Sequence, residues 1–302
     1  MLCAYQIPLS IYRPSAAISA LFLLCLLTAC RQPANDPRLL IGGPGDQRSP
    51  TWMPDGKRIV CSSAADGFPA DLYLCNPANG TSYPLTGDPS GDNSPAVSPN
   101  GRWLLFHSDR GGQSDLYCLD LATSETVRLT TNPANDSFGA WSPDSQRIVF
   151  HSEGAGDPDL WLMDRNGENK IPLVMRPGVD TTAAWSPNGR AIAFSSEAGG
   201  NPDIWLVYFD DRRSVQLTNS SEAEWKPAWS PDGRRIAYCR GPTKGGHSTL
   251  WIMNADGSDQ RPLTPRGKWD DFDPAWSPNG RTIAFESNRN GDFDIWSVEA
   301  KR

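Results

Sequence analysis

Five acidic residues recur at a nearly fixed spacing and are the first candidates for chemistry. Each lies seven residues before a proline of a repeated phrase, and we call them the repeat acids: Asp92, Asp136, Asp180, Glu224 and Asp271. If the repeats form a ring, these carboxylates gather near a channel mouth and focus negative potential that could hold a cation or a basic side chain. In the alternative interpretation, each acid caps its own loop by accepting hydrogen bonds from nearby amides.

The same residues bear on metals and catalysis. Carboxylate oxygens favour calcium or magnesium over zinc, so calcium at the channel mouth is the one cofactor they suggest, and none is predicted otherwise. The sequence has no G-x-S-x-G motif, and no partner at suitable spacing makes a catalytic or metal site with His107, His151 or His247. We therefore predict no catalytic residue and no enzyme, with a metal-dependent lyase or lactonase built from scattered residues as an alternative.

Four aromatic residues break the repeat instead of following it: Phe138, Trp225, Trp269 and Phe272. They lie in the same segments as the repeat acids. Aromatic side chains beside a polar rim are typical of protein interfaces and of carbohydrate platforms. Packing of these rings onto their own loops is the alternative.

The element that must position these residues is a repeat of about 44 residues. Its phrase AWSP(D/N)G is marked by prolines at positions 54, 99, 143, 187, 231 and 278. Each copy contains four short alternating runs, separated by turns rich in Gly, Pro, Asn and Asp, which predict four β-strands. Six such units predict an all-β fold, a six-bladed β-propeller of four-stranded blades.

The two ends of the repeat predict how the ring closes. The last copy stops after its third strand, and the run RLLI at 38–41 precedes the first copy. We expect this N-terminal strand to complete the last blade. Repeated tryptophans, such as Trp141 and Trp276 on first strands and Trp205 on a third strand, are expected to fill the space between blades.

Composition narrows the class of partner. The net charge is −7 with a pI near 5.0, which argues against nucleic acid, because phosphates require a basic surface. Four cysteines remain outside the leader, and their positions differ between repeats, so no disulfide framework is visible. Cys61 and Cys75 lie on strands predicted to be neighbours and are the one pair whose bonding is left open.

The first thirty residues have a different composition. A single charge, Arg13, precedes the apolar run AAISALFLLCLLTA, which is too short for a permanent membrane span but typical of a secretory signal. The following sequence LTAC resembles the bacterial lipobox, whose cysteine is acylated. We predict a signal peptide at 1–29, lipidation of Cys30, a lipidated tether at 30–37 and the propeller at 38–302. Contact with a membrane is then expected through the N-terminal lipid alone.

The repeated phrase AWSPDG…IAF…DLW…PLT resembles the TolB-type β-propeller, and the similarity covers about 38–298. We expect no counterpart of the α/β domain and N-terminal tail of TolB in this sequence. The lipobox resemblance implies a lipoprotein, placed by Arg31 after the cysteine at the periplasmic face of the outer membrane if the cell is Gram-negative, whereas the TolB resemblance implies a protein of the cell envelope. It also implies a protein-interaction platform whose envelope partner resembles a peptidoglycan-associated lipoprotein. A glycan or peptidoglycan-fragment binding protein using Trp225 and Trp269 is the alternative.

Overall fold

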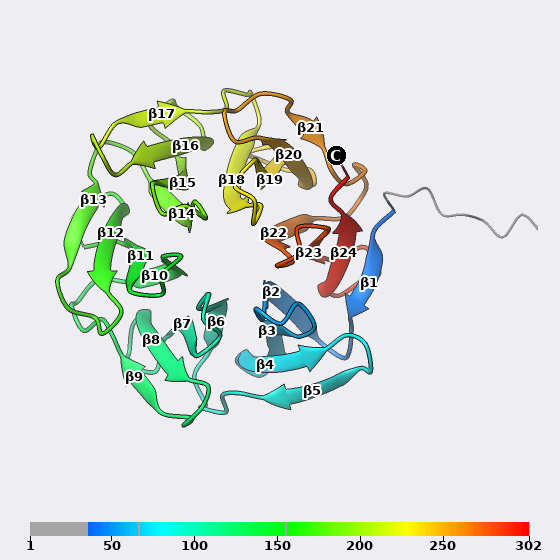
Figure 1. Cartoon of the computed structure of the whole chain (residues 1–302). Helices are drawn as coiled ribbons and strands as arrows, with labels where there is room; N and C mark the ends of the chain where they lie inside the picture. The colour runs from blue at the N-terminus through cyan, green and yellow to red at the C-terminus, as the bar shows by residue number, and fades with distance from the viewer. Residues whose placement is uncertain (1–35, 66, 155, 302) are drawn as a thin grey trace, which may run out of the picture. The chain divides into compact units, whose positions relative to one another are not determined.

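The computed structural model describes residues 36–65, 67–154 and 156–301, and their strands form six four-stranded antiparallel sheets arranged in a ring (Figure 1). The predicted signal peptide, Cys30 and most of the predicted tether lie outside the described residues. Within the described ranges, no helix is long and apolar enough to cross a membrane.

Each blade contains consecutive strands. Blade 1 consists of β2 (Asp46–Trp52), β3 (Ile59–Ala64), β4 (Asp71–Asn76) and β5 (Thr81–Pro84). Blade 2 consists of β6 (Asp92–Val97), β7 (Trp103–Ser108), β8 (Asp115–Asp120) and β9 (Thr126–Arg128). Blade 3 consists of β10 (Asp136–Trp141), β11 (Arg147–Ser152), β12 (Asp159–Asp164) and β13 (Ile171–Val174).

The second half repeats this order. Blade 4 consists of β14 (Asp180–Trp185), β15 (Ala191–Ser196), β16 (Asp203–Tyr208) and β17 (Ser214–Gln216). Blade 5 consists of β18 (Ala223–Trp229), β19 (Arg235–Gly241), β20 (Thr249–Asn254) and β21 (Arg261–Pro262). Blade 6 consists of β22 (Asp271–Trp276), β23 (Thr282–Ser287) and β24 (Asp294–Glu299), completed by β1 (Arg38–Ile41).

The predicted closure is confirmed. Strand β1 pairs antiparallel with β24, with Arg38 opposite Ser297 and Leu39 opposite Trp296, so the N-terminal strand supplies the fourth strand of blade 6. The β24 edge would otherwise expose unpaired backbone groups. In Figure 1 the blue β1 lies beside the red β24.

A backbone hydrogen bond joins neighbouring blades at one repeated position. The N–H of Asp136, at the start of blade 3, donates to the carbonyl of Ser114 in blade 2 at 2.8 Å. Across the closure, the N–H of Gln47 donates to the carbonyl of Phe293 at 2.6 Å. The first strand of a blade is thereby fixed to the segment before the third strand of its neighbour.

First-strand tryptophans fill the space between blades, as the sequence predicts. Trp141 and Trp276 are buried, and their indole N–H groups donate to the carbonyls of Ala96 and Ala228, each in the preceding blade, at 3.0 Å. Trp52 makes the same contact across the closure, with Ala275, at 3.1 Å. In these three copies the tryptophan thus contributes apolar burial and also donates a hydrogen bond to a carbonyl of the preceding blade.

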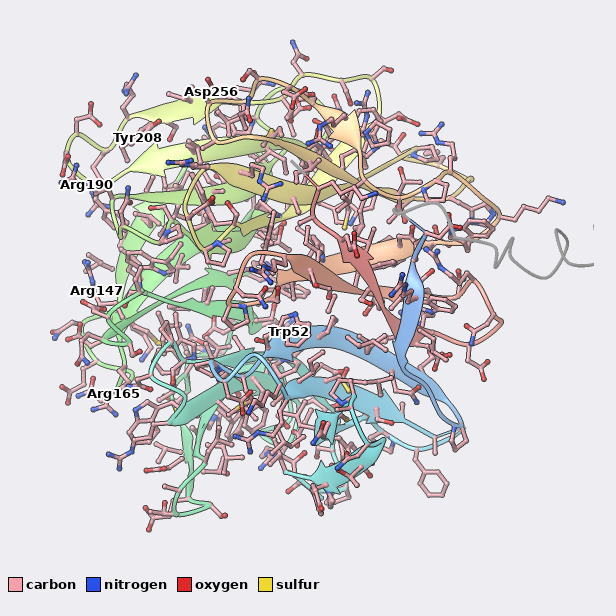
Figure 2. The ribbon with its side chains drawn as sticks, turned by 45° about the vertical axis from the view of Figure 1, so that its right-hand side comes forward. Trp52, Arg147, Arg165, Arg190, Tyr208 and Asp256 are labelled. Carbon is pink, nitrogen blue, oxygen red and sulfur yellow. The ribbon has the colours of Figure 1, made fainter. Side chains whose placement is uncertain are left out.

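Short hairpin turns lie on one side of the ring and the longer connections on the other. Figure 2 shows Arg147, Arg165 and Arg190, which lie in or directly beside the short turns, along one side of the molecule. Glycines such as Gly56 and Gly233 allow these turns, with φ of 65° and 68°. We call the opposite side, which carries the longer connections, the loop face.

Candidate functional site

One residue from each blade lines the central channel, and we call this set the channel ring: Ser49, Ser94, Phe138, Thr182, Lys226 and Asp273. Each lies in the first strand of its blade, where the pairing with the second strand shifts register. All six have a positive φ, between 48° and 56°. This conformation is uncommon for non-glycine residues and is strained for bulky or β-branched ones, and such strain clusters at functional sites.

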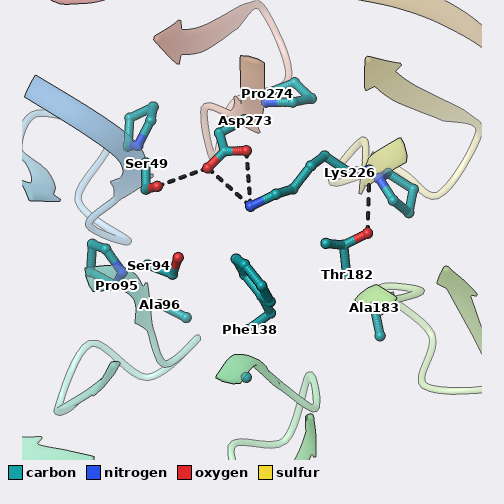
Figure 3. A pocket seen from close by; sticks show the side chains of 13 residues that line it. Ser49, Ser94, Pro95, Ala96, Phe138, Thr182, Ala183, Lys226, Asp273 and Pro274 are labelled. Carbon is teal, nitrogen blue, oxygen red and sulfur yellow. Dashed lines mark hydrogen bonds and ion pairs between the residues drawn. The ribbon is translucent and has the colours of Figure 1, made fainter. Parts of the chain in front are cut away.

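The channel ring is polar and joined across blades (Figure 3). The ammonium of Lys226 lies 3.0 Å from one carboxylate oxygen of Asp273 and 3.1 Å from the other. The hydroxyl of Ser49 donates to the same carboxylate at 2.8 Å, and the backbone N–H of Lys226 donates to the Thr182 hydroxyl at 3.3 Å. The Lys226 ammonium also lies 4.3 Å from the ring centroid of Phe138, within the range of a cation–π contact.

The ring surrounds a cavity of about 190 Å³, which is also lined by prolines that lie within the register shifts. Pockets for small organic ligands are larger, about 300–1,000 Å³. The volume and the half-buried Lys226–Asp273 pair therefore suit one inserted side chain or a very small ligand.

A second layer of side chains lies behind the ring on the second strands. Burial lowers the pKa of His107 to about 4, and it also lowers the pKa of His151, whose Nδ1 lies 3.2 Å from the Ser137 hydroxyl. Burial raises the pKa of Cys239 well above its ordinary value. Burial, together with the charge of Asp273, raises the pKa of Glu286 to about 7. The layer around Phe138 is therefore neutral at physiological pH, and charge is concentrated on the opposite side of the channel.

The structure corrects the expectation of an open ring formed by the repeat acids. All five are fully buried at the start of the first strands, and none of them lines the channel cavity. Four are covered by arginines: Asp92 by Arg110, Asp180 by Arg176, Glu224 by Arg240 and Asp271 by Arg289. An arginine thus lies over each of these four acids, and for Glu224 burial still raises the pKa to about 7. A role of the repeat acids in partner binding stays a prediction.

The four repeat-breaking aromatics divide between the channel and the loop face, and all are half-buried. Phe138 belongs to the channel ring, with its ring centroid 5.5 Å from that of His107. Trp225 and Phe272 contact each other with centroids 6.2 Å apart, and Trp269 lies 5.3 Å from the guanidinium carbon of Arg289. Trp225 and Phe272 thus pack against each other between blades 5 and 6, Trp269 packs within blade 6, and Phe138 is the one of the four that lines the cavity.

Sequence reasoning missed the other five members of the channel ring. Their signal in the sequence is weak: the residue five positions before each repeat proline varies from copy to copy, and so does the residue before it, although the phrase that follows is nearly constant. For metals, the described part of the chain contains no group of three His, Cys, Asp or Glu side chains placed to hold an ion.

Comparison with known proteins addresses the fold. The family profile of the TolB beta propeller domain matches residues 38–138 and 133–244. A putative TolB from Agrobacterium tumefaciens is similar with a TM-score of 0.71 at 21% identity, covering 88% of this chain and 94% of that one. TolB from Acinetobacter baumannii gives 0.66 at 21% identity, covering 87% of this chain and 66% of that one. An oligogalacturonate lyase in complex with manganese gives 0.58 at 16% identity, covering 85% of this chain and 90% of that one.

Proposed function

The chain belongs to the TolB β-propeller domain family, and we propose that it is a protein-binding platform whose partner engages the loop face and inserts one polar side chain into the central channel. The observation that carries the proposal is the channel ring. Six non-glycine residues share a strained backbone geometry while their side chains differ from blade to blade. Packing between blades does not account for this variation, because the packing position three residues later stays apolar in every copy, as tryptophan in five and Val97 in one.

The chemistry of the ring indicates how a partner is held. Lys226 and Asp273 are held in place by Ser49, Thr182 and Phe138, so the charge pair is ordered before the partner arrives. A partner side chain with both donor and acceptor atoms can bond to the ammonium and the carboxylate together. Because the pair is half-buried, such bonds are less screened than at an open surface.

The location that fits this function is the cell envelope. Lipidation at Cys30 would hold the propeller at the periplasmic face of an outer membrane, close to peptidoglycan-associated lipoproteins. A partner of that kind is the one we propose, and the TolB neighbours support the proposal at the level of fold.

The test compares two lysine variants of the full-length protein. Lys226→Met removes the channel cation, and Lys57→Met removes an exposed lysine of a short turn on the opposite side. Purified protein is immobilised, and binding of a purified peptidoglycan-associated lipoprotein domain from the same cell is measured by biolayer interferometry. We expect at least tenfold weaker binding by the channel variant and no change in the control.

Equal binding by both variants would refute the channel as the site. No binding by the wild type would refute this partner. The wild-type protein is then used to test the two alternatives. Titration with peptidoglycan fragments tests glycan binding. Measurement of oligogalacturonate turnover, with and without chelator, tests metal-dependent lyase activity.

A further inference from the structure

Blades 2, 4 and 6 contain the same arrangement around a half-buried guanidinium, blade 5 contains part of it, and we call it the guanidinium slot. In blade 2 the Nη2 of Arg110 lies 2.7 and 2.8 Å from the two carboxylate oxygens of Asp92. Its Nε donates to the Ser108 hydroxyl at 3.0 Å. The guanidinium carbon lies 4.9 Å from the ring centroid of Tyr117 and 5.5 Å from that of Phe106. The slot therefore consists of an acid, a hydroxyl and two aromatic rings.

Blades 4, 5 and 6 have an arginine over the same strand-start acid and third-strand aromatic. The guanidinium carbons of Arg176, Arg240 and Arg289 lie 4.3, 4.2 and 4.9 Å from the ring centroids of Trp205, Trp251 and Trp296. The arginines come from different positions: Arg176 precedes its acid by four residues, and Arg289 follows its acid by 18. The sequence position of the arginine varies between blades, but the group that occupies the slot is a guanidinium in each case. We infer that the slot itself selects a guanidinium.

Blade 3 has the slot without the arginine. The residue equivalent to Arg110 is Gly154. In place of the side chain there is a cavity of about 310 Å³, lined by Phe150, Ser152 and Trp161, which are the equivalents of Phe106, Ser108 and Tyr117. Asn132 and Glu153 also line it. The aromatic and hydroxyl parts of the slot are thus present and open to a cavity.

The acid of this slot, Asp136, lacks a cationic partner within the described ranges. It is fully buried, and neither carboxylate oxygen accepts a hydrogen bond of good geometry. Burial raises its pKa, although the nearby side chains of Ser152, Thr130 and Asn132 lower it in part. The one cation lining the cavity, Lys170, donates instead to the backbone carbonyls of Leu129 and Gly167.

We propose that blade 3 binds the guanidinium group of an arginine side chain supplied by another polypeptide. The group would stack against Trp161 and Phe150, donate to the Ser152 hydroxyl and pair with Asp136 once the Asn132 side chain turns aside. A guanidinium fits better than an ammonium because it is planar, weakly hydrated and carries five donors. This inference goes beyond the proposed function, because the cavity is separate from the channel and requires none of its residues.

Blade 1 provides an internal comparison. Its equivalent of the acid is Gln47, whose amide nitrogen donates to the carbonyl of Gly45 at 2.9 Å. Cys61 replaces the second-strand aromatic, beside a cavity that Tyr73 also lines. With neither the buried acid nor the second ring, blade 1 is not expected to hold a guanidinium, so one site per chain is expected.

Isothermal titration calorimetry with full-length protein tests the proposal. The probe is Nα-acetyl-L-arginine methylamide, which mimics an arginine within a polypeptide. The citrulline and lysine equivalents are the matched control compounds. Free arginine tests whether the natural ligand is a metabolite instead of a polypeptide. We expect one site for the arginine probe, and at least tenfold weaker binding of the citrulline and lysine compounds. Free arginine, whose charged α-groups must approach the same opening, should bind more weakly than the blocked probe. Equal binding of the citrulline or lysine compound would overturn the proposal, and tighter binding of free arginine would overturn the polypeptide source.

Three variants assign the site. Asp136→Asn should weaken binding at least tenfold, whereas Asp256→Asn, at an exposed turn, should not. Gly154→Arg should abolish binding and raise the melting temperature, because it restores the arginine of the repeat; a Cβ there lies 3.2 Å from the Cβ of Ala134, which requires only a small shift. Arg110→Ala should open a second slot and change the stoichiometry from one to two. Absence of binding to the wild type, or undiminished binding to Gly154→Arg, would overturn the proposal, whatever the result with Lys226→Met.

Discussion

The buried glutamate behind the channel ring should make the stability of the propeller depend on pH, and Glu286→Gln should remove that dependence. Glu286 is 4% exposed in β23. It accepts a hydrogen bond from the N–H of Ser49 at 2.7 Å and lies 3.4 Å from Arg48. Burial is the main cause that raises its pKa, and the negative charge of Asp273 adds to it.

The size of the effect follows from the pKa in the two states. The carboxyl has a pKa of 4.5 in the unfolded chain and about 7 in the folded protein. Because the folded pKa is the higher one, the stabilising contribution is present in full below pH 4.5 and is lost as the pH rises to about 7. At about 1.4 kcal/mol for each pKa unit, the loss is about 3 kcal/mol. For a domain of this size, that corresponds to about 6 °C in melting temperature.

Thermal unfolding of wild type and Glu286→Gln at pH 5 and pH 8.5 measures this contribution, because other titrating groups cancel in the difference between the two proteins. We expect the variant to gain about 2–3 kcal/mol relative to the wild type between the two pH values. Glu299→Gln, which changes an exposed glutamate on β24, is the matched control and should show no such gain. An equal difference between Glu286→Gln and wild type at both pH values would refute the reasoning.

Three further predictions concern the framework. Trp276→Ala should reduce the free energy of unfolding by about 3–5 kcal/mol in urea titrations, since it removes a buried indole and leaves the carbonyl of Ala228 unpaired; a loss below 1 kcal/mol would contradict its role between blades. Deletion of residues 38–41 should lower the melting temperature and cause self-association through the exposed β24 edge, measured by light scattering, and a monomer with unchanged melting would contradict closure by β1. Mild oxidation should join Cys61 to Cys75, whose sulfurs lie 3.8 Å apart, and peptide mapping that finds Cys118 or Cys239 in the linked pair instead would contradict this.

The framework could be predicted from the sequence because each of its features is repeated. The alternation of the strands, the turn residues and the spacing of the packing residues recur from copy to copy. A strand that is predicted poorly in one copy can therefore be assigned from the others. The orphan strand at 38–41 and the truncated last copy predicted the closure that β1 and β24 make. A strand pairing between the two ends of the repeats was predictable only because the repeat count left one strand over before the first copy and one strand short in the last.

The sites were not predictable in the same way, because spacing along the chain does not say what covers a side chain. The repeat acids lie at the predicted strand starts, but the arginines that bury them approach from before the acid in one blade and from after it in others. The channel ring depends on a register shift and a positive φ at non-glycine residues, and the alternating pattern of a strand contains no sign of either.

Comparison among the copies recovers part of what spacing cannot give. At the channel ring the side-chain type changes while the backbone geometry stays constant, as expected where a scaffold presents different groups to a ligand. At the guanidinium slot of blade 3 the aromatic and hydroxyl groups are retained, but the arginine is absent. Gly154 therefore marks a site that lacks the guanidinium found in the equivalent slots. The first kind of departure can be found in the sequence alone. The second requires the structure, because only the contacts of Arg110, Arg176 and Arg289 show that arginines from two different repeat positions lie over the same strand-start acid.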